Sequence, residues 1–244
     1  MEKIVTYDNL HYFTYSNDKS CAKPIRGIVV LFCGLGVDPM ETTDVIEDAG
    51  YAEEGIIYLV PYQNPWAWMN KQTVAFTDEL LDVLFEKYQL PDDLPIVSTG
   101  LSMGGLESLV YMVYAKRTPV ACVPNCPVCD LVFHYTERID LPRTLYNTFG
   151  NYDCTLKEAM EMTSPMHLVD KMPESAEYHI FHCEEDLAVN KQLHSDKFVE
   201  LMRKNHNVSY YSVPGMGHCE LTPQMHKLFH SCIRDSIHKY YADN

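Results

Sequence analysis

A strand-like run that leads directly into a serine between glycines is the feature that most constrains the fold of this chain. Residues 95–99 are mostly apolar or β-branched, Gly100, Ser102 and Gly104 follow in a Gly-x-Ser-x-Gly pattern, and residues 106–116 are compatible with a helix. At such a turn the chain reverses sharply, and the glycines leave room where side chains would collide with the strand or the helix. The sequence therefore predicts a strand–turn–helix unit that presents the Ser102 hydroxyl at the positive end of a helix.

Strand-like and helix-like segments alternate along most of the chain. The strands are expected at residues 27–32, 55–60, 95–99, 120–123, 178–182 and 208–213, and the helices at 41–49, 74–88, 106–116, 191–204 and 223–240. Strands separated by helices of this kind form mainly parallel sheets that are covered on both faces. We therefore predict an α/β fold, and the 244 residues suit one domain of that class.

Two segments break the alternation. Residues 5–7 and 11–15 flank an Asp8-Asn9 turn, which predicts an N-terminal antiparallel hairpin. Residues 130–172 contain helix-like fragments, prolines and aromatic residues but no clear strand. We expect residues 1–244 to form a single domain in which residues 130–172 are an insertion, or cap, over the strand ends and the site.

The charge balance narrows the range of partners. The chain has 34 Asp and Glu against 19 Lys and Arg, a formal net charge of −15. Such a surface repels phosphate backbones and anionic lipids, so neither nucleic acid nor a membrane is an expected partner. Residues 1–9 show no secretory signal pattern, and the nine cysteines are an odd number, so we expect free thiols and a cytoplasmic location.

No metal and no cofactor is expected. Cys126 and Cys129 have Cys-x-x-Cys spacing, but no second Cys or His pair with zinc spacing accompanies them. We interpret them as buried thiols. The oligomeric state is not indicated by the sequence.

Three residues that follow strands have the chemistry of a catalytic triad. Ser102, Asp186 and His218 occur in this order, each in a loop at the carboxyl end of a predicted strand. A serine hydroxyl is a weak nucleophile until an imidazole takes its proton, and a buried carboxylate holds that imidazole in the useful tautomer. Among 11 histidines, His218 alone lies after a strand in a glycine-flanked loop near the C-terminus.

Other acids are open alternatives to Asp186. Glu184 and Glu185 are its neighbours, and Asp130 follows the strand after the elbow helix, where such folds can also place the acid.

Serine chemistry of this kind also needs two backbone donors for the oxyanion. The amide of Met103, directly after the nucleophile, is one candidate. The amide of Leu35 is the other, because Gly34 and Gly36 let its loop approach the substrate oxygen. Gly34 is a candidate substrate contact for the same reason.

These residues together resemble those of an α/β-hydrolase. From residue 27 onward the chain is most similar to the catalytic domain of the prolyl-oligopeptidase type and to its single-domain serine esterase relatives. The matching segments are residues 100–105, 163–165, 182–189 and 215–218. The resemblance implies Ser102, Asp186 and His218 as the triad. Cys33 and Cys183 depart from it, since they stand where histidine and glycine are usual.

The expected reaction is hydrolysis of a small carboxylic ester through an acyl-enzyme. Peptidases of the resembled type usually carry a large propeller domain, and 244 residues leave no room for one. A single-domain peptidase, aminopeptidase or amidase, acyl transfer to another acceptor and a non-catalytic binding protein of the same fold are the alternatives.

Aromatic residues and cysteines complete the predicted site. Tyr62, Trp66 and Trp68 follow the strand at 55–60 and are expected to line the pocket mouth, with packing under the insertion as the alternative. Cys33, Cys183 and Cys219 lie in the three converging loops, so their thiols should be near the site.

Overall fold

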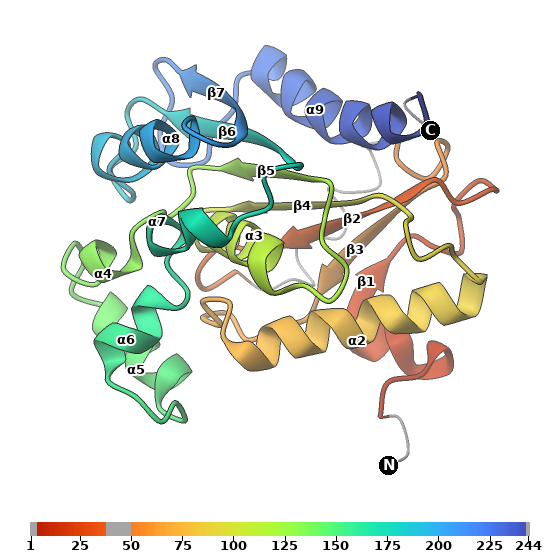
Figure 1. Ribbon diagram of the computed structural model, residues 1–244, viewed down its shortest axis with the longest axis horizontal. Coiled ribbons are helices and arrows are strands. Elements are labelled where there is room, and N and C mark those ends of the chain that lie inside the picture. Colours follow the sequence, from red (N-terminus) through yellow and green to blue (C-terminus); the bar gives the residue numbers. More distant parts are fainter. Residues whose placement is uncertain (1–3, 38–49, 243–244) are drawn as a thin grey trace.

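The protein is built around one seven-stranded sheet. The structure, a computed structural model, describes residues 4–37 and 50–242. The strand order is β1-β3-β2-β4-β5-β6-β7, and every neighbouring pair except β1 with β3 is parallel (Figure 1). The strands are β1 (Thr14–Ser16), β2 (Gly27–Phe32), β3 (Ile56–Pro61), β4 (Ile96–Leu101), β5 (Ala121–Asn125), β6 (Glu177–Cys183) and β7 (Asn207–Val213). The predicted mainly parallel α/β sheet is thus confirmed.

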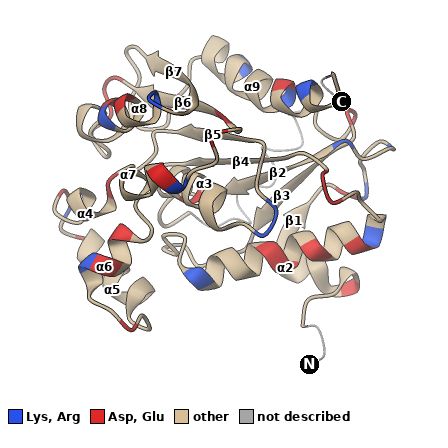
Figure 2. Cartoon of the chain, viewed as in Figure 1, with Lys and Arg blue, Asp and Glu red and all other residues tan. Residues whose placement is uncertain are grey.

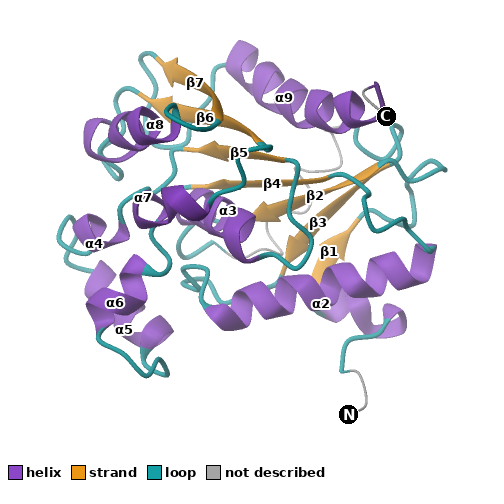
Figure 3. Cartoon of the chain, in the orientation of Figure 1, coloured by secondary structure: helices purple, strands orange, loops and turns teal. Residues whose placement is uncertain are grey.

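Helices cover both faces of the sheet (Figure 3). They are η1 (Tyr7–Tyr12), α2 (Lys71–Tyr88), α3 (Met103–Tyr114), α4 (Leu131–His134), α5 (Leu141–Phe149), α6 (Leu156–Glu161), α7 (Pro165–Leu168), η4 (Val169–Lys171), the π-helix η5 (Gln192–Asp196), α8 (Lys197–Met202) and α9 (Pro223–Ala242). Charged residues lie mainly on these helices and on the loops (Figure 2). The helix expected at residues 41–49 lies outside the described residues.

The two-residue period of the strands explains this layering. Ile28 of β2 joins one apolar core with Leu80 of α2 and Leu106 of α3. Its neighbour Val29 points to the opposite face and joins a second core with Ile233 of α9. A strand buried on both faces needs a continuous apolar run, which is what residues 28–32 supply. Within the described ranges, no helix combines the length and apolar character needed to cross a membrane.

The N-terminal segment differs from the predicted hairpin. An antiparallel strand is present, but β1 pairs with β3 through Thr14 and Pro61, and not with residues 5–7. Residues 7–12 form η1 instead. Leu10 of η1 is buried and joins the apolar core, so the energy gained by that burial favours the short helix over a local strand pair.

Residues 130–172 form the short helices α4 to α7 and η4 between β5 and β6. They gather beyond one end of the strands, beside α3 (Figure 1). Leu141 and Leu145 of α5 are fully buried and belong to the main apolar core. The segment is therefore packed firmly onto the sheet domain.

Candidate active site

Ser102 occupies the turn between β4 and α3. Its φ of 59° lies in the region that L residues rarely adopt. A Cβ at Gly100 would lie 2.1 Å from the carbonyl oxygen of Gly104, and one at Gly104 would lie 2.0 Å from that of Phe32. Both glycines are therefore needed for β4, β2 and α3 to meet at this turn.

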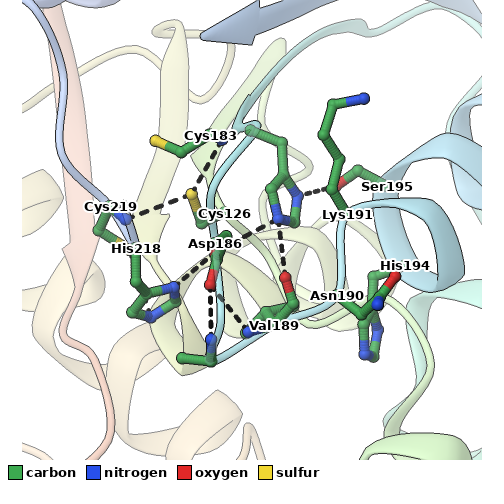
Figure 4. A network of polar contacts seen from close by, with 12 residues as sticks. Cys126, Cys183, Asp186, Val189, Asn190, Lys191, His194, Ser195, His218 and Cys219 are labelled. Carbon is green, nitrogen blue, oxygen red and sulfur yellow. Dashed lines mark hydrogen bonds and ion pairs between the residues drawn. The ribbon is translucent and has the colours of Figure 1, made fainter. Parts of the chain in front are cut away.

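His218 is joined to a buried carboxylate. Its Nδ1 donates to Oδ2 of Asp186 at 2.6 Å (Figure 4). The Asp186 side chain is buried, and its Oδ1 accepts the amides of Ala188 and Val189 at 2.8 and 2.9 Å. Burial alone would raise the pKa of Asp186, but the hydrogen bonds from His182 and His218 outweigh it and lower the pKa. Asp186 is thus held as an anion against the imidazole.

The imidazole of His218 is the more exposed partner, with 29% of its side chain accessible. Burial opposes its protonated form, but the hydrogen bond to Asp186 and the nearby sulfur of Cys126 outweigh it and raise the pKa of His218 to about 9. Because Nδ1 carries the proton donated to Asp186, Nε2 is left to accept one. This is the arrangement that a general base requires.

The alternative acids have other partners. Asp130 is the N-cap of α4, and its Oδ1 accepts the Phe133 amide at 3.0 Å. Glu184 accepts the hydroxyl of Ser212 at 2.7 Å, and Glu185 is exposed. Among these four carboxylates, Asp186 is the one hydrogen-bonded to His218.

Asn125, at the end of β5, links the Ser102 turn to the His218 loop. Its carbonyl oxygen accepts the Ser102 amide at 3.0 Å, and its Nδ2 donates to the carbonyl oxygen of Cys219 at 3.1 Å. Asn125 is fully buried, so this bridge is shielded from water. Sequence reasoning missed it, because nothing in the local pattern distinguishes the last residue of β5.

The predicted oxyanion loop lies against the turn. A Cβ at Gly34 would be 3.8 Å from Cβ of Ser102, so the backbone of this loop passes close to the predicted nucleophile. Within residues 4–37 and 50–242, hydrogen bonds engage the amides of Gly36 and Val37, whereas none engages the Leu35 amide. Met103 begins α3, so its amide has no intrahelical acceptor. Among the described residues, neither predicted donor is therefore committed to another acceptor.

His182 is a further residue that the sequence reasoning did not assign. Its ring is fully buried, with Nε2 3.1 Å from the Val189 carbonyl oxygen and 3.3 Å from Oδ2 of Asp186. The Ser195 hydroxyl lies 2.6 Å from its Nδ1. His182 therefore braces the Asp186 loop through its contacts with Val189 and Asp186. Its position at the end of the strand before Asp186 was the available signal.

The three aromatic residues predicted at the pocket mouth lie in different places. Trp68 is 1% exposed and donates to Thr144 of α5 at 3.0 Å, so it packs beneath the insertion and does not line a pocket mouth. Trp66 is 38% exposed and lines a hollow of about 620 Å³ with α5 residues. Tyr62 lines a separate hollow of about 510 Å³ beside α2. Neither set of lining residues includes Ser102 or His218.

Of the three thiols predicted near the site, that of Cys219 lies beside His218. Cys219 Sγ is 3.6 Å from Nε2 of His218, and the carbonyl oxygen of Cys33 would lie 2.8 Å from a Cβ at Gly104. The amide of Cys183 donates to the sulfur of Cys126 at 3.4 Å.

One histidine cluster away from Ser102 has metal-ligand residue types but is satisfied by hydrogen bonds. Glu137 Oε2 lies 2.6 Å from Nδ1 of His134 and 2.7 Å from Nε2 of His194. The amides of Cys129 and Asp130 donate to Nδ1 of His194. Nε2 of His194 therefore carries the proton given to Glu137, and the cluster ties α4 to η5.

Comparison with known proteins identifies the family. The prolyl oligopeptidase family matches residues 66–232, which is more than half of the chain. No curated protein matches it.

Similar solved structures share the fold. Est1E from Butyrivibrio proteoclasticus has a TM-score of 0.62 at 15% identity, covering 92% of this chain and 93% of that one. The propionate-bound esterase Est2 of Thermogutta terrifontis has a TM-score of 0.65 at 16% identity, covering 93% and 89%. An acylaminoacyl peptidase of Pyrococcus horikoshii has a TM-score of 0.61 at 11% identity, covering 84% of this chain and 35% of that one.

Proposed function

Since this chain belongs to the prolyl oligopeptidase family and is a serine hydrolase of the α/β-hydrolase fold, we propose that it cleaves small carboxylic esters with Ser102, His218 and Asp186. The observation that carries the proposal is the hydrogen bond from His218 to the buried carboxylate of Asp186. Asn125 adds support, because it ties the loop of that histidine to the turn that holds Ser102.

The proposed reaction has two balanced halves. Nε2 of His218 takes the proton of the Ser102 hydroxyl as Oγ attacks the ester carbonyl, and the amides of Met103 and Leu35 receive the oxyanion. Collapse of the tetrahedral intermediate returns the proton from His218 to the departing alcohol and leaves an acyl group on Ser102. A water molecule then gives its proton to His218 and attacks the acyl carbon. The carboxylic acid leaves, and Ser102 recovers its proton.

The ester assignment draws support from the extent of the structural matches. Est1E and Est2 match this chain over nearly their whole length, whereas the acylaminoacyl peptidase matches over about a third of its own. The Est2 structure holds bound propionate, a short carboxylate, which favours a short acyl group here. The family name favours a second candidate, hydrolysis of short peptides or amides.

We extend the proposal to the remainder of the chain. Residues 130–172 act as a cap within a single domain, and Trp66 contacts the substrate on that side. Gly34 and Tyr62 remain proposed contacts. All nine cysteines are free, which supports the proposed cytoplasmic location.

A panel of substrates tests the reaction. Purified protein is assayed with p-nitrophenyl acetate, butyrate and octanoate and with aminoacyl p-nitroanilides. We expect turnover of the short esters, and Ser102→Ala should lower kcat on the order of 10⁴ to 10⁶. Ser20→Ala, which removes an exposed hydroxyl, is the matched control. Equal rates for Ser102→Ala and wild type would refute the nucleophile, and turnover of anilides alone would favour the peptidase.

A further inference from the structure

Two cysteines and a histidine gather beside the Asp186 carboxylate. The sulfurs of Cys126 and Cys219 and a ring nitrogen of His218 all lie within 4.8 Å of one another. Cys126 directly follows β5, whereas His218 and Cys219 come from the loop after β7, so only the fold brings them together (Figure 4). The neighbouring Cys183 is occupied elsewhere, because its thiol donates to the Glu220 carbonyl oxygen at 2.9 Å.

The spacing of Cys219 and His218 fits a tetrahedral zinc ion. Zn–S bonds of about 2.3 Å and Zn–N bonds of about 2.0–2.1 Å imply a sulfur-to-nitrogen distance of roughly 3.5 Å in a tetrahedral site. The observed distance from Cys219 Sγ to His218 Nε2 is 3.6 Å. This pair needs almost no movement to bind the same ion.

Hydrogen bonds hold both kinds of candidate ligand in place. Nδ1 of His218 donates to Asp186, so the lone pair of Nε2 faces Cys219, as in the carboxylate–histidine–zinc arrangement. The sulfur of Cys126 accepts the amides of Cys183 at 3.4 Å and Cys219 at 3.3 Å.

Backbone strain is concentrated at the same two cysteines. Cys126 has a φ of 48° and Cys219 a φ of 61°, values that favour glycine. Strain of this kind persists where the surrounding structure holds the chain in a functional geometry. Here the two strained residues are those whose sulfurs lie within 4.8 Å of a ring nitrogen of His218.

We propose that Cys126, Cys219 and Nε2 of His218 bind Zn²⁺ and that the bound ion inhibits the hydrolase. The binding site stands on the geometry alone, whereas the inhibition rests on the proposed function, because a zinc-bound Nε2 is no longer free to take the proton of Ser102. Binding releases the two thiol protons to solvent, and water completes the fourth position. The accessible side of His218, 29% of its side chain, is the entry path.

Binding is measured first, without reference to catalysis. Equilibrium dialysis of Zn²⁺ against Ser102→Ala should give one tight ion per chain. Adding Cys219→Ala should weaken binding by about 100-fold or more, and adding Asp186→Asn by roughly 10–100-fold. Cys126→Ser is read only where its circular dichroism matches wild type. Cys232→Ala, a buried thiol on α9, is the matched control and should leave binding unchanged.

Binding that is unaffected by Cys219→Ala would overturn the site. Inhibition is then tested on the ester activity of wild type. Zn²⁺ should abolish this activity, and EDTA should restore it. At the same Zn²⁺ concentration, Cys219→Ala should keep most of the rate that the variant shows without metal. Tight binding with no loss of activity would refute the inhibitory role. If the protein hydrolyses no ester, the dialysis result still decides the site, so the two failures are distinguishable.

Discussion

Replacing Glu107 by glutamine should make the protein progressively more stable than wild type as the pH rises. Glu107 is fully buried on α3, directly behind the Ser102 turn. Its Oε1 accepts the Met69 amide at 3.2 Å, and its Oε2 accepts a hydrogen bond from the Gln63 amide. Burial outweighs both hydrogen bonds and raises the pKa of Glu107 from 4.5 to about 8.

The size of the effect follows from this pKa shift. Below pH 4.5 the carboxyl is protonated in both the folded and the unfolded chain. As the pH rises toward 8, the unfolded chain loses the proton and the folded chain keeps it, so the folded state becomes relatively less stable. This lowers the free energy of unfolding of wild type by roughly 5 kcal/mol in total once the pH is above 9. About 4 kcal/mol of this loss develops between pH 5 and pH 9. Glutamine does not titrate, so Glu107→Gln does not undergo this pH-dependent loss of stability.

Urea unfolding of wild type and Glu107→Gln at pH 5, 7 and 9 measures this difference. The free energy of unfolding of the variant, minus that of wild type, should rise by about 4 kcal/mol from pH 5 to pH 9. The difference between the two proteins cancels every other titrating group. Glu200→Gln, on the exposed surface of α8, controls for loss of one negative charge. A difference that stays flat with pH would refute the reasoning.

Three further predictions concern the site and its support. Asp186→Asn should lower kcat by on the order of 10⁴, because an amide favours the wrong tautomer of His218; steady-state kinetics that show less than about a tenfold loss would exclude Asp186 as the acid. In EDTA, kcat/KM of wild type should rise with pH and level off only near pH 9, the pKa of His218, because only the neutral ring accepts the proton of Ser102. A plateau already at pH 7 would contradict this. Gly104→Ala should yield little folded protein by circular dichroism, because its Cβ would lie 2.0 Å from the Phe32 carbonyl oxygen. Gly36→Ala should still fold, because no atom of the described residues lies within 4 Å of its Cβ and only the strain of its φ of 75° opposes it. Equal yields would argue against the steric account.

The proposed substrate contact of Trp66 makes a last prediction. Trp66→Ala should change the ratio of kcat/KM for octanoate to that for acetate more than it changes the rate on acetate, because Trp66 is exposed beside α5 of the cap. An unchanged ratio, measured with the p-nitrophenyl esters, would remove this side of the cap from substrate binding.

Local sequence patterns predicted most of the fold. Continuous apolar runs such as residues 28–32 predict strands buried on both faces, and the helical spacing of Leu80, Leu81 and Leu84 predicts α2. The glycines around Ser102 predict the turn between β4 and α3, because a Cβ at Gly100 or Gly104 would collide with nearby backbone atoms. These features depend on side-chain size and periodicity, which a sequence states directly.

Other features depend on which strands become neighbours, and only the tertiary structure decided them. The segment before β1 formed a short helix that buries Leu10 in the apolar core, and β1 pairs with β3, some 45 residues further along the chain. Trp68 is buried because α5 folds over it. The bridge of Asn125 and the meeting of Cys126 with Cys219 exist because β5, β6 and β7 end at the same edge of the sheet. The sequence alone determined which residue types occupy the loop of His218. The pairing energy between distant strands, which no local pattern encodes, determined which other loops lie beside it.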